Sequence, residues 1–108
     1  MNLDTFGFEI DLLGSIVMNG MTMDAVEIVE KLPIEAFTDF RTRELFAVIK
    51  RLSKHNEIVN ITTVVHEIEK NPNSSFAYPI ADVADCCKAA CASPSQYKAY
   101  AKKLRQAM

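Results

Sequence analysis

At 108 residues, the chain is long enough to bury the core of one domain and too short for a multidomain enzyme. Hydrophobic residues make up 49% and charged residues 24%, with only three Gly and four Pro, which argues against wholesale disorder. No apolar run approaches the ~18 residues of a membrane span, and residues 1–10 lack the pattern of a signal peptide. We therefore expect a single domain over residues 1–108, no membrane contact and a cytoplasmic location.

The net charge of −2 conceals a gradient along the chain. Residues 1–40 carry eight acids and one base, whereas residues 41–108 carry eleven bases and six acids. Such an asymmetry can orient a partner or a neighbouring subunit electrostatically. Ordinary solvated faces are the alternative that we favour, because soluble domains need mixed surface charge.

Apolar residues recur at helical spacing in the first third of the chain and predict two helices. The first covers residues 8–19 and ends before Gly20, which tolerates the positive φ that often follows a helix. The second is capped by Thr22 or Asp24 and ends at Leu32, before a proline. The residues expected to be buried in the first helix are Phe8, Leu12, Leu13, Ile16 and Val17.

A single turn at residues 34–37 is expected to precede the strongest helix, which Thr38 or Asp39 caps and which covers residues 40–54. We expect this helix to be the centre of the core. Its buried stripe should contain Leu45, Val48, Ile49 and Leu52, flanked by Phe46. Its basic side chains should stay in water, namely Arg43, Lys50, Arg51 and Lys54.

Two further helices are expected in the second half. Asn60 caps the first, which ends at Asn71, and Ser74 or Ser75 opens the second, with Pro79 in its first turn. The inward residues of the second are Phe76, Ile80, Val83, Ala84, Cys87 and Cys91. Because no segment shows the alternation of a strand, the sequence predicts an all-α orthogonal bundle of about six short helices.

The last helix has the most complete start signal in the chain. Ser93 can act as N-cap, Pro94 suits the first helical position, and Gln96 can close a capping box. The apolar stripe that follows is Tyr97, Tyr100, Ala101, Leu104 and Met108. No Gly, Asn or Pro follows to stop it, so we expect this helix to continue in a longer chain or to be completed by a partner.

Sequence patterns for catalysis are absent. The glycines are dispersed and no phosphate-binding loop occurs, so we expect no nucleotide hydrolysis by this chain. We expect solvated rather than catalytic roles for His55 and His66. Cys87 and Cys91 share a helical face but lack the other two ligands that zinc needs, so core packing is expected. We predict no catalytic residue, metal or cofactor, and expect core filling from Met18, Met21 and Met23.

Nucleic-acid binding is a further possibility raised by the bases of the last helix, Lys98, Lys102, Lys103 and Arg105. The sequence pI near 5.6 and the lack of aromatic residues interleaved with bases argue against a dedicated binder.

The order of several segments resembles the N-terminal domain of DnaB-type replicative DNA helicases of bacteria and phages. An acid followed by Leu-Gly and an aliphatic run opens the pattern, and an aromatic segment, a capping turn and a Tyr-Ala helix end it. Between them lie three further matches. The segments are EIDLLGSIVM (9–18), LPIEAF (32–37), TRELFAVIKRL (42–52), VNITTV (59–64), FAYPIADVAD (76–85) and ASPSQYKAYAKKLRQA (92–107).

Two departures from the family pattern keep the local structure. NPNSS at residues 71–75 replaces the family's Gly-Gly turn, and Asn60 replaces an Asp. Each replacement preserves a turn or a cap, so the fold implied by the resemblance is unaffected. The resemblance also implies what is missing from residues 1–108, namely the rest of a hairpin that residues 93–108 begin and an ATPase motor.

The resemblance implies a non-catalytic role in assembly and docking. In such helicases this domain forms an N-terminal collar with the other helicase subunits and binds primase or loader proteins, meeting DNA only indirectly. The residues expected to make these contacts are Tyr97, Tyr100, Lys102, Lys103, Leu104 and Arg105. Packing of the same apolar stripe against the domain's own core is the alternative.

Two other functions remain open at this stage. The chain can be a stand-alone, phage-type loader or inhibitor that mimics the helicase collar, or a small helical nucleic-acid binder.

Overall fold

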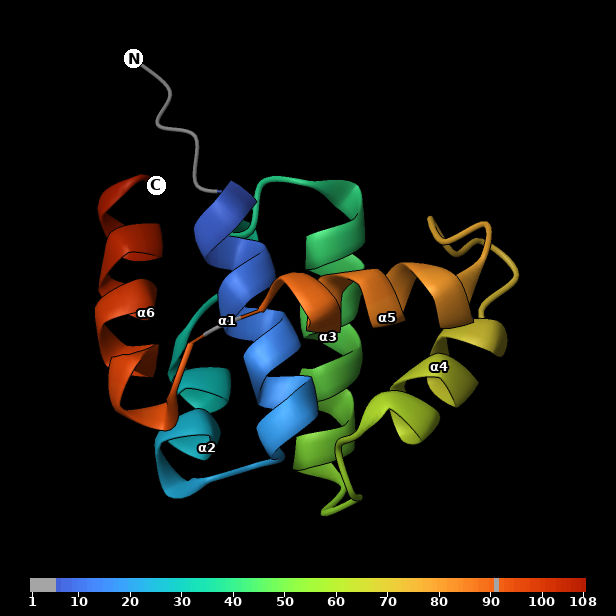
Figure 1. The fold of residues 1–108 in the computed structure, drawn as a ribbon, viewed down its shortest axis with the longest axis horizontal. Helices are drawn as coiled ribbons and strands as arrows, with labels where there is room; N and C mark the ends of the chain where they lie inside the picture. Colours follow the sequence, from blue (N-terminus) through green and yellow to red (C-terminus); the bar gives the residue numbers. More distant parts are fainter. Residues whose placement is uncertain (1–5, 91) are drawn as a thin grey trace.

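The computed structural model describes residues 6–90 and 92–108, and over these residues it contains helices and no strand (Figure 1). The six α-helices are α1 (Phe6–Asn19), α2 (Met23–Lys31), α3 (Phe40–Lys54), α4 (Ile61–Glu69), α5 (Pro79–Ala89) and α6 (Tyr97–Gln106). Two single 3-10 turns are η1 (Ile34–Ala36) before α3 and η2 (Pro94–Gln96) before α6. The expected all-α fold of about six short helices is confirmed.

Helix α1 occupies the middle of the domain (Figure 1). It packs against α3, α4, α5 and α6, while α2 bridges α3 and α6 and α4 lies against α3 and α5. The sequence predicted α3 as the centre of the core. That prediction is wrong because the buried side of α1 extends through consecutive residues, from Leu12 to Val17, so neighbours can pack on it from several directions.

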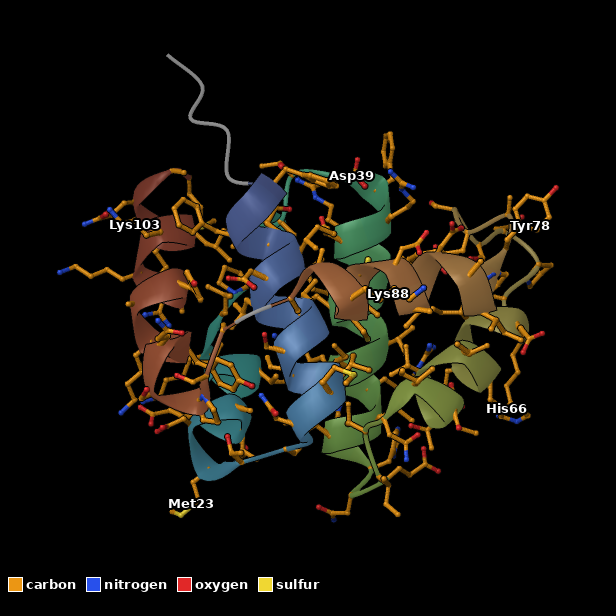
Figure 2. The ribbon with its side chains drawn as sticks, in the orientation of Figure 1. Met23, Asp39, His66, Tyr78, Lys88 and Lys103 are labelled. Carbon is orange, nitrogen blue, oxygen red and sulfur yellow. The ribbon has the colours of Figure 1, made fainter. Side chains whose placement is uncertain are left out.

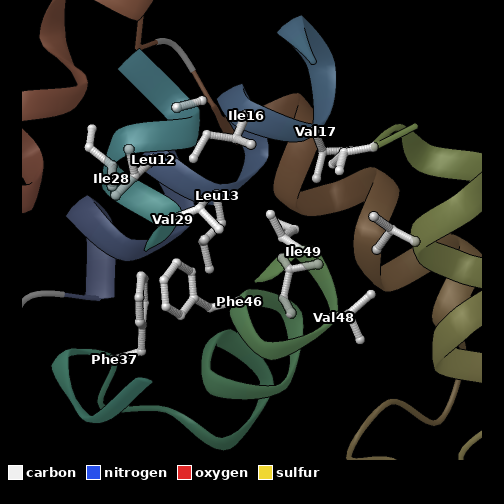
Figure 3. Close-up of a cluster of buried hydrophobic side chains, with 14 of the residues drawn as sticks. Leu12, Leu13, Ile16, Val17, Ile28, Val29, Phe37, Phe46, Val48 and Ile49 are labelled. Carbon is white, nitrogen blue, oxygen red and sulfur yellow. The ribbon is translucent and has the colours of Figure 1, made fainter. Parts of the chain in front are cut away.

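The core contains an aromatic pair at the turn that precedes α3. The ring centroids of Phe37 and Phe46 lie 4.5 Å apart, and both rings are fully buried (Figure 3). Aromatic pairs at this spacing stabilise a core beyond the area that they bury. Phe46 therefore belongs to the core of the domain rather than to the flank of a stripe.

Two basic side chains of α3 that were expected to stay in water make polar contacts: Lys50 is half-buried, whereas Arg43 stays exposed as expected. Lys50 donates to the carbonyl oxygen of Leu32 at 3.0 Å, and its ammonium lies 5.4 Å from the centroid of the Phe46 ring. The Arg43 Nε donates to the carbonyl oxygen of Phe37. Both acceptors lie in the connection between α2 and α3 and outside the 3-10 turn η1.

Helix α5 starts at Pro79 and not at Ser74 or Ser75 as the sequence suggested. The reason is Glu44 of α3, whose carboxylate accepts from the Ser74 hydroxyl at 2.5 Å and from the Ser75 N–H at 2.7 Å. These bonds fix the segment as a loop before the helix begins. Phe76 is buried within that loop, whereas Ile80, expected inward, is 66% exposed.

Other burial predictions have mixed outcomes. Cys87 is buried as expected, and Cys91 lies outside the described residues. Met18 and Met23 are 61% and 90% exposed, so the prediction that they fill the core is wrong, while Met21 packs partly against it. The exposed pair lies at the end of α1 and the start of α2, on either side of the tight turn at Gly20, which has a φ of +79°.

Gly14 lies where α1 crosses α5. A Cβ at this position would come within 2.5 Å of the Cys86 carbonyl oxygen and 2.7 Å of the Ala90 Cβ. Since the carbonyl is backbone and cannot rotate away, only glycine fits this crossing without displacing a helix. The Leu-Gly pair of the sequence therefore has a packing role.

Candidate interaction surfaces

The start of the last helix has the capping contacts that the sequence predicted. The Ser93 backbone N–H donates to Gln96 Oε1 at 2.9 Å, and Pro94 occupies the first position of η2, which leads into α6. A further hydrogen bond, from the Ala92 N–H to the buried Ser15 hydroxyl at 3.0 Å, attaches this turn to α1. The position of α6 is therefore fixed at its beginning by both local and distant contacts.

Two of the predicted contact residues lie inside the domain. Tyr97 and Leu104 are fully buried, and the Tyr97 hydroxyl accepts a hydrogen bond from the Asn19 amide at 3.0 Å. Burial raises the pKa of Tyr97, and the bond from Asn19 opposes this in part. The side chains of Tyr97 and Leu104 are therefore not accessible to a partner in this fold. For these two residues the structure shows the core packing that the sequence left as an alternative.

The apolar stripe of α6 meets solvent only near Tyr100. The Tyr100 ring lies 5.7 Å from that of Phe8 on α1, centroid to centroid. Tyr100 is half-buried and Phe8 is 37% exposed, so Phe8, which was expected in the core, lies at its edge. Met108 is exposed and takes no part in the buried stripe.

The basic residues of α6 lie on two different flanks. Lys103 follows Tyr100 by three residues and so lies on the same side of the helix; Figure 2 shows it at the outer edge of the domain. Lys102 and Arg105 lie on the other flank, in a shallow groove against α2 that Lys98 and Lys31 also line. The sequence grouped these residues together, and the structure divides them.

The charges of this groove are unbalanced. Lys98 lies 3.8 Å from Asp24 and 3.6 Å from Glu27, and Lys31 lies 3.1 Å from Glu27. Lys31 and Lys98 hold the pKa of the Glu27 carboxyl below its usual value, with the Lys31 hydrogen bond as the largest cause. Lys102 and Arg105 form no ion pair with any residue that the structure describes. We call these two residues the basic flank.

A buried acid that the sequence predictions did not place in the core organises the start of α1 and α3. Glu9 is fully buried and accepts hydrogen bonds from the Thr38 N–H and hydroxyl at 2.8 and 2.7 Å, and from the Thr42 hydroxyl at 2.7 Å. Glu9 lies three and four residues before Leu12 and Leu13, so helical spacing already placed it on the buried face. Its role is to hold the two helix starts together.

The structure offers little that suggests catalysis. Among residues 6–90 and 92–108 no group of three metal-ligating side chains occurs, and His55 and His66 lie in solvent. Burial raises the pKa of the Cys86 and Cys87 thiols, which disfavours the nucleophilic thiolate. No helix in the described part of the chain is long and apolar enough to cross a membrane.

Comparison with known proteins identifies the fold. The chain matches the family described as DnaB-like helicase N terminal domain over residues 4–106 of 108, which leaves no ATPase domain within it. Searches against curated proteins and against solved structures gave no match. The match spans all six helices, the Gly14 crossing and the Glu9 cluster. The chain therefore belongs to the family of DnaB-like helicase N-terminal domains.

Proposed function

We propose that this domain is a non-catalytic assembly and docking domain of a replicative DNA helicase. It joins other helicase subunits in an N-terminal collar and binds primase or a loader protein during DNA replication, and it meets DNA only through that assembly. Family membership supports the association with a helicase. The basic flank of α6 supports a docking role, and it is the observation on which the proposal depends.

The contact surface that we propose consists of Tyr100, Lys103 and the basic flank. Lys102 and Arg105 are exposed and have no acid to pair with among the described residues. Charges of this kind speed encounter with an acidic partner and fix its orientation. The Tyr100 ring adds an apolar contact with a polar tip, which is typical of residues at interfaces. Tyr97 and Leu104 position α6 from inside the core.

The direct test is a mass measurement of the 108-residue chain mixed with the C-terminal domain of its cognate primase, by size-exclusion chromatography with light scattering. We expect a complex for the wild type. The double variant Lys102→Glu/Arg105→Glu should bind about tenfold more weakly or worse, because it places like charges opposite an acidic partner. The control Lys54→Glu/Lys88→Glu makes the same change in charge at exposed positions outside α6 and should bind as the wild type does.

Absence of a complex at high concentration would count against primase docking. Equal weakening of both double variants would show that only the overall charge matters and not the basic flank. Replacing primase by a loader protein in the same experiment decides which of the two partners the surface binds.

Direct nucleic-acid binding is the second candidate, favoured by the same unpaired cations. A titration with single-stranded DNA at rising salt tests it, since phosphate contacts lose affinity steeply with salt. No affinity at low salt removes this candidate. The reading frame after Met108 distinguishes a stand-alone loader or inhibitor from part of a helicase. A stop codon directly after Met108 indicates the stand-alone factor. A reading frame that continues into a phosphate-binding loop indicates a helicase.

A further inference from the structure

A second concave surface lies away from α6, where the first turns of α1 and α3 meet the outer side of α5. It is a cleft of about 220 Å³. Its apolar lining consists of Phe6, Ile10, Leu45 and Phe76. The start of α1 separates it from the surface described above, and Figure 2 shows Asp39, which precedes α3, and Lys103 of α6 on either side of that helix.

The size of the cleft fits a side chain better than a cofactor. Pockets for drug-sized ligands measure roughly 300–1,000 Å³, which is larger than this one. A cavity of roughly 150 Å³ is known to hold benzene, so about 220 Å³ suits one aromatic or branched aliphatic side chain with part of its neighbour. Apolar side chains inserted in such pockets act as anchors in protein interfaces.

The charges at the rim of the cleft favour a cation. Arg41 already has an acid, Asp39, at 3.6 Å. On the α5 side, Asp82 accepts only a long hydrogen bond, 3.4 Å, from the Tyr78 N–H, and Asp85 pairs with no residue in the described part of the chain. Two carboxylates therefore remain available beside an apolar floor, and among the described residues that line the cleft Arg41 is the only lysine or arginine.

The Cys86 thiol lines the same cleft. Burial is the main cause that raises the pKa of the Cys86 thiol; neighbouring Cys87, Asp82 and Asp85 raise it further, while Arg41 lowers it. The two carboxylates, like Arg41, therefore lie close enough to act on a side chain that lines the cleft.

We propose that this cleft is a docking site for a basic amphipathic segment of a partner protein. One apolar side chain of the segment enters between Phe6, Ile10 and Phe76, and a Lys or Arg beside it pairs with Asp82 and Asp85. The occupant is thus a positively charged helix or peptide, opposite in charge to the partner expected for the basic flank. This inference goes beyond the proposed function, because it concerns another face and a partner of other chemistry.

The experiment uses three fluorescein-labelled peptides of about 14 residues, four helical turns, with the chain at constant salt. The first carries Leu and Lys at the 3.6-residue spacing that places them on opposite faces of an amphipathic helix. The second has Ser in place of Leu, and the third has Glu in place of Lys. Fluorescence anisotropy should show saturable binding of the first peptide and at least about tenfold weaker binding of the other two, since both the anchor and the cation are needed.

Variants of the chain show where the Leu-Lys peptide binds. Asp82→Asn/Asp85→Asn should weaken binding of the Leu-Lys peptide about tenfold, whereas Glu30→Gln/Glu69→Gln, which removes two exposed acids elsewhere, should leave it unchanged. Asp85→Asn alone keeps the first turn of α5 intact and should give part of the loss. Amide chemical shifts of Phe6, Ile10, Leu45 and Phe76 should move on binding.

Three results would overturn the inference: equal binding of the Leu-Lys and Ser-Lys peptides, equal loss in both double variants, or shift changes confined to α6. Sedimentation of the chain alone supplies a fourth. If the chain dimerises and Asp82→Asn/Asp85→Asn abolishes the dimer, the occupant is a second copy and not another protein. Because no experiment here involves primase or Lys102, failure leaves the proposed function standing.

Discussion

The carboxylate of Glu9 bonds to both the backbone N–H and the hydroxyl of Thr38, twenty-nine residues later, at 2.8 and 2.7 Å. Thr38 precedes the N-cap of α3, Asp39, so the acid of α1 holds the chain at the point where α3 is about to begin. A carboxylate is a better acceptor than a neutral group, and hydrogen bonds to charged groups contribute more to stability. Glu9 thus joins two helix starts that the sequence keeps far apart.

We predict that Glu9→Ala lowers the free energy of unfolding by about 3 kcal/mol, because the buried hydroxyl of Thr42 and the two donors of Thr38 lose this acceptor. Glu9→Gln should lose less, since one amide oxygen still accepts. Urea unfolding followed by circular dichroism measures both. The control Glu35→Ala removes an exposed acid of η1 and should change stability by less than about 0.5 kcal/mol. Similar losses for Glu9→Ala and Glu35→Ala would contradict the role assigned to the buried carboxylate.

The crossing of α1 and α5 at Gly14 gives the second prediction. Gly14→Ala should destabilise the domain by about 3 kcal/mol or prevent folding, because the new methyl group would meet the backbone of Cys86 at 2.5 Å. The matched control is Gly7→Ala in the same helix, where the Cβ has nothing within 4 Å. There alanine should be neutral or stabilise by up to about 1 kcal/mol through its helix propensity. Gly14→Ala should therefore lower the midpoint temperature of thermal unfolding, whereas Gly7→Ala should leave it unchanged or raise it. A Gly14→Ala protein as stable as the wild type would show that the helices can move apart freely.

Local signals predicted most of the helices correctly. The bounds of α3 agree with those expected, and the Thr22 and Asn60 caps form as proposed, because a cap depends only on residues within one turn. The start of α5 was predicted wrongly since Glu44, thirty residues away, holds the preceding loop. Lys50 was misplaced for the same reason, as its acceptor belongs to another element. The periodicity of apolar residues does not indicate such contacts between distant segments.

The candidate surface shows the same limit. The spacing of Tyr97 and Leu104 correctly indicated an apolar stripe, but a stripe does not say whether a partner or the domain itself covers it. Here Asn19 and the core cover it. The cations of α6 were recognisable from sequence, whereas the separation of Lys103 from the basic flank depends on where α2 packs. The cleft beside α5 had no sequence signal, because its lining residues come from three helices and a loop.

Because the Tyr97 hydroxyl is buried, we expect the free energy of unfolding to fall as the pH becomes alkaline. Unfolded tyrosine loses its proton near pH 10, about its ordinary pKa, whereas burial raises the pKa of Tyr97 in the folded domain. Between these two values the unfolded chain binds fewer protons than the folded one, so the free energy of unfolding falls as pH rises. Tyr97→Phe removes the ionisation together with the hydrogen bond from Asn19, which contributes about 1 kcal/mol at neutral pH.

The wild type should therefore be more stable than Tyr97→Phe at neutral pH, and this advantage should shrink or reverse above about pH 10. The measurement is the difference in free energy of unfolding between the two proteins across that range, in which the titration of lysines and cysteines cancels. Tyr78→Phe is the control, because Tyr78 is 75% exposed and its ionisation should affect folded and unfolded chains alike. A difference in free energy of unfolding that stays constant with pH would contradict this prediction. It would mean that water reaches the Tyr97 hydroxyl, because α6 opens from α1 more readily than its buried stripe implies.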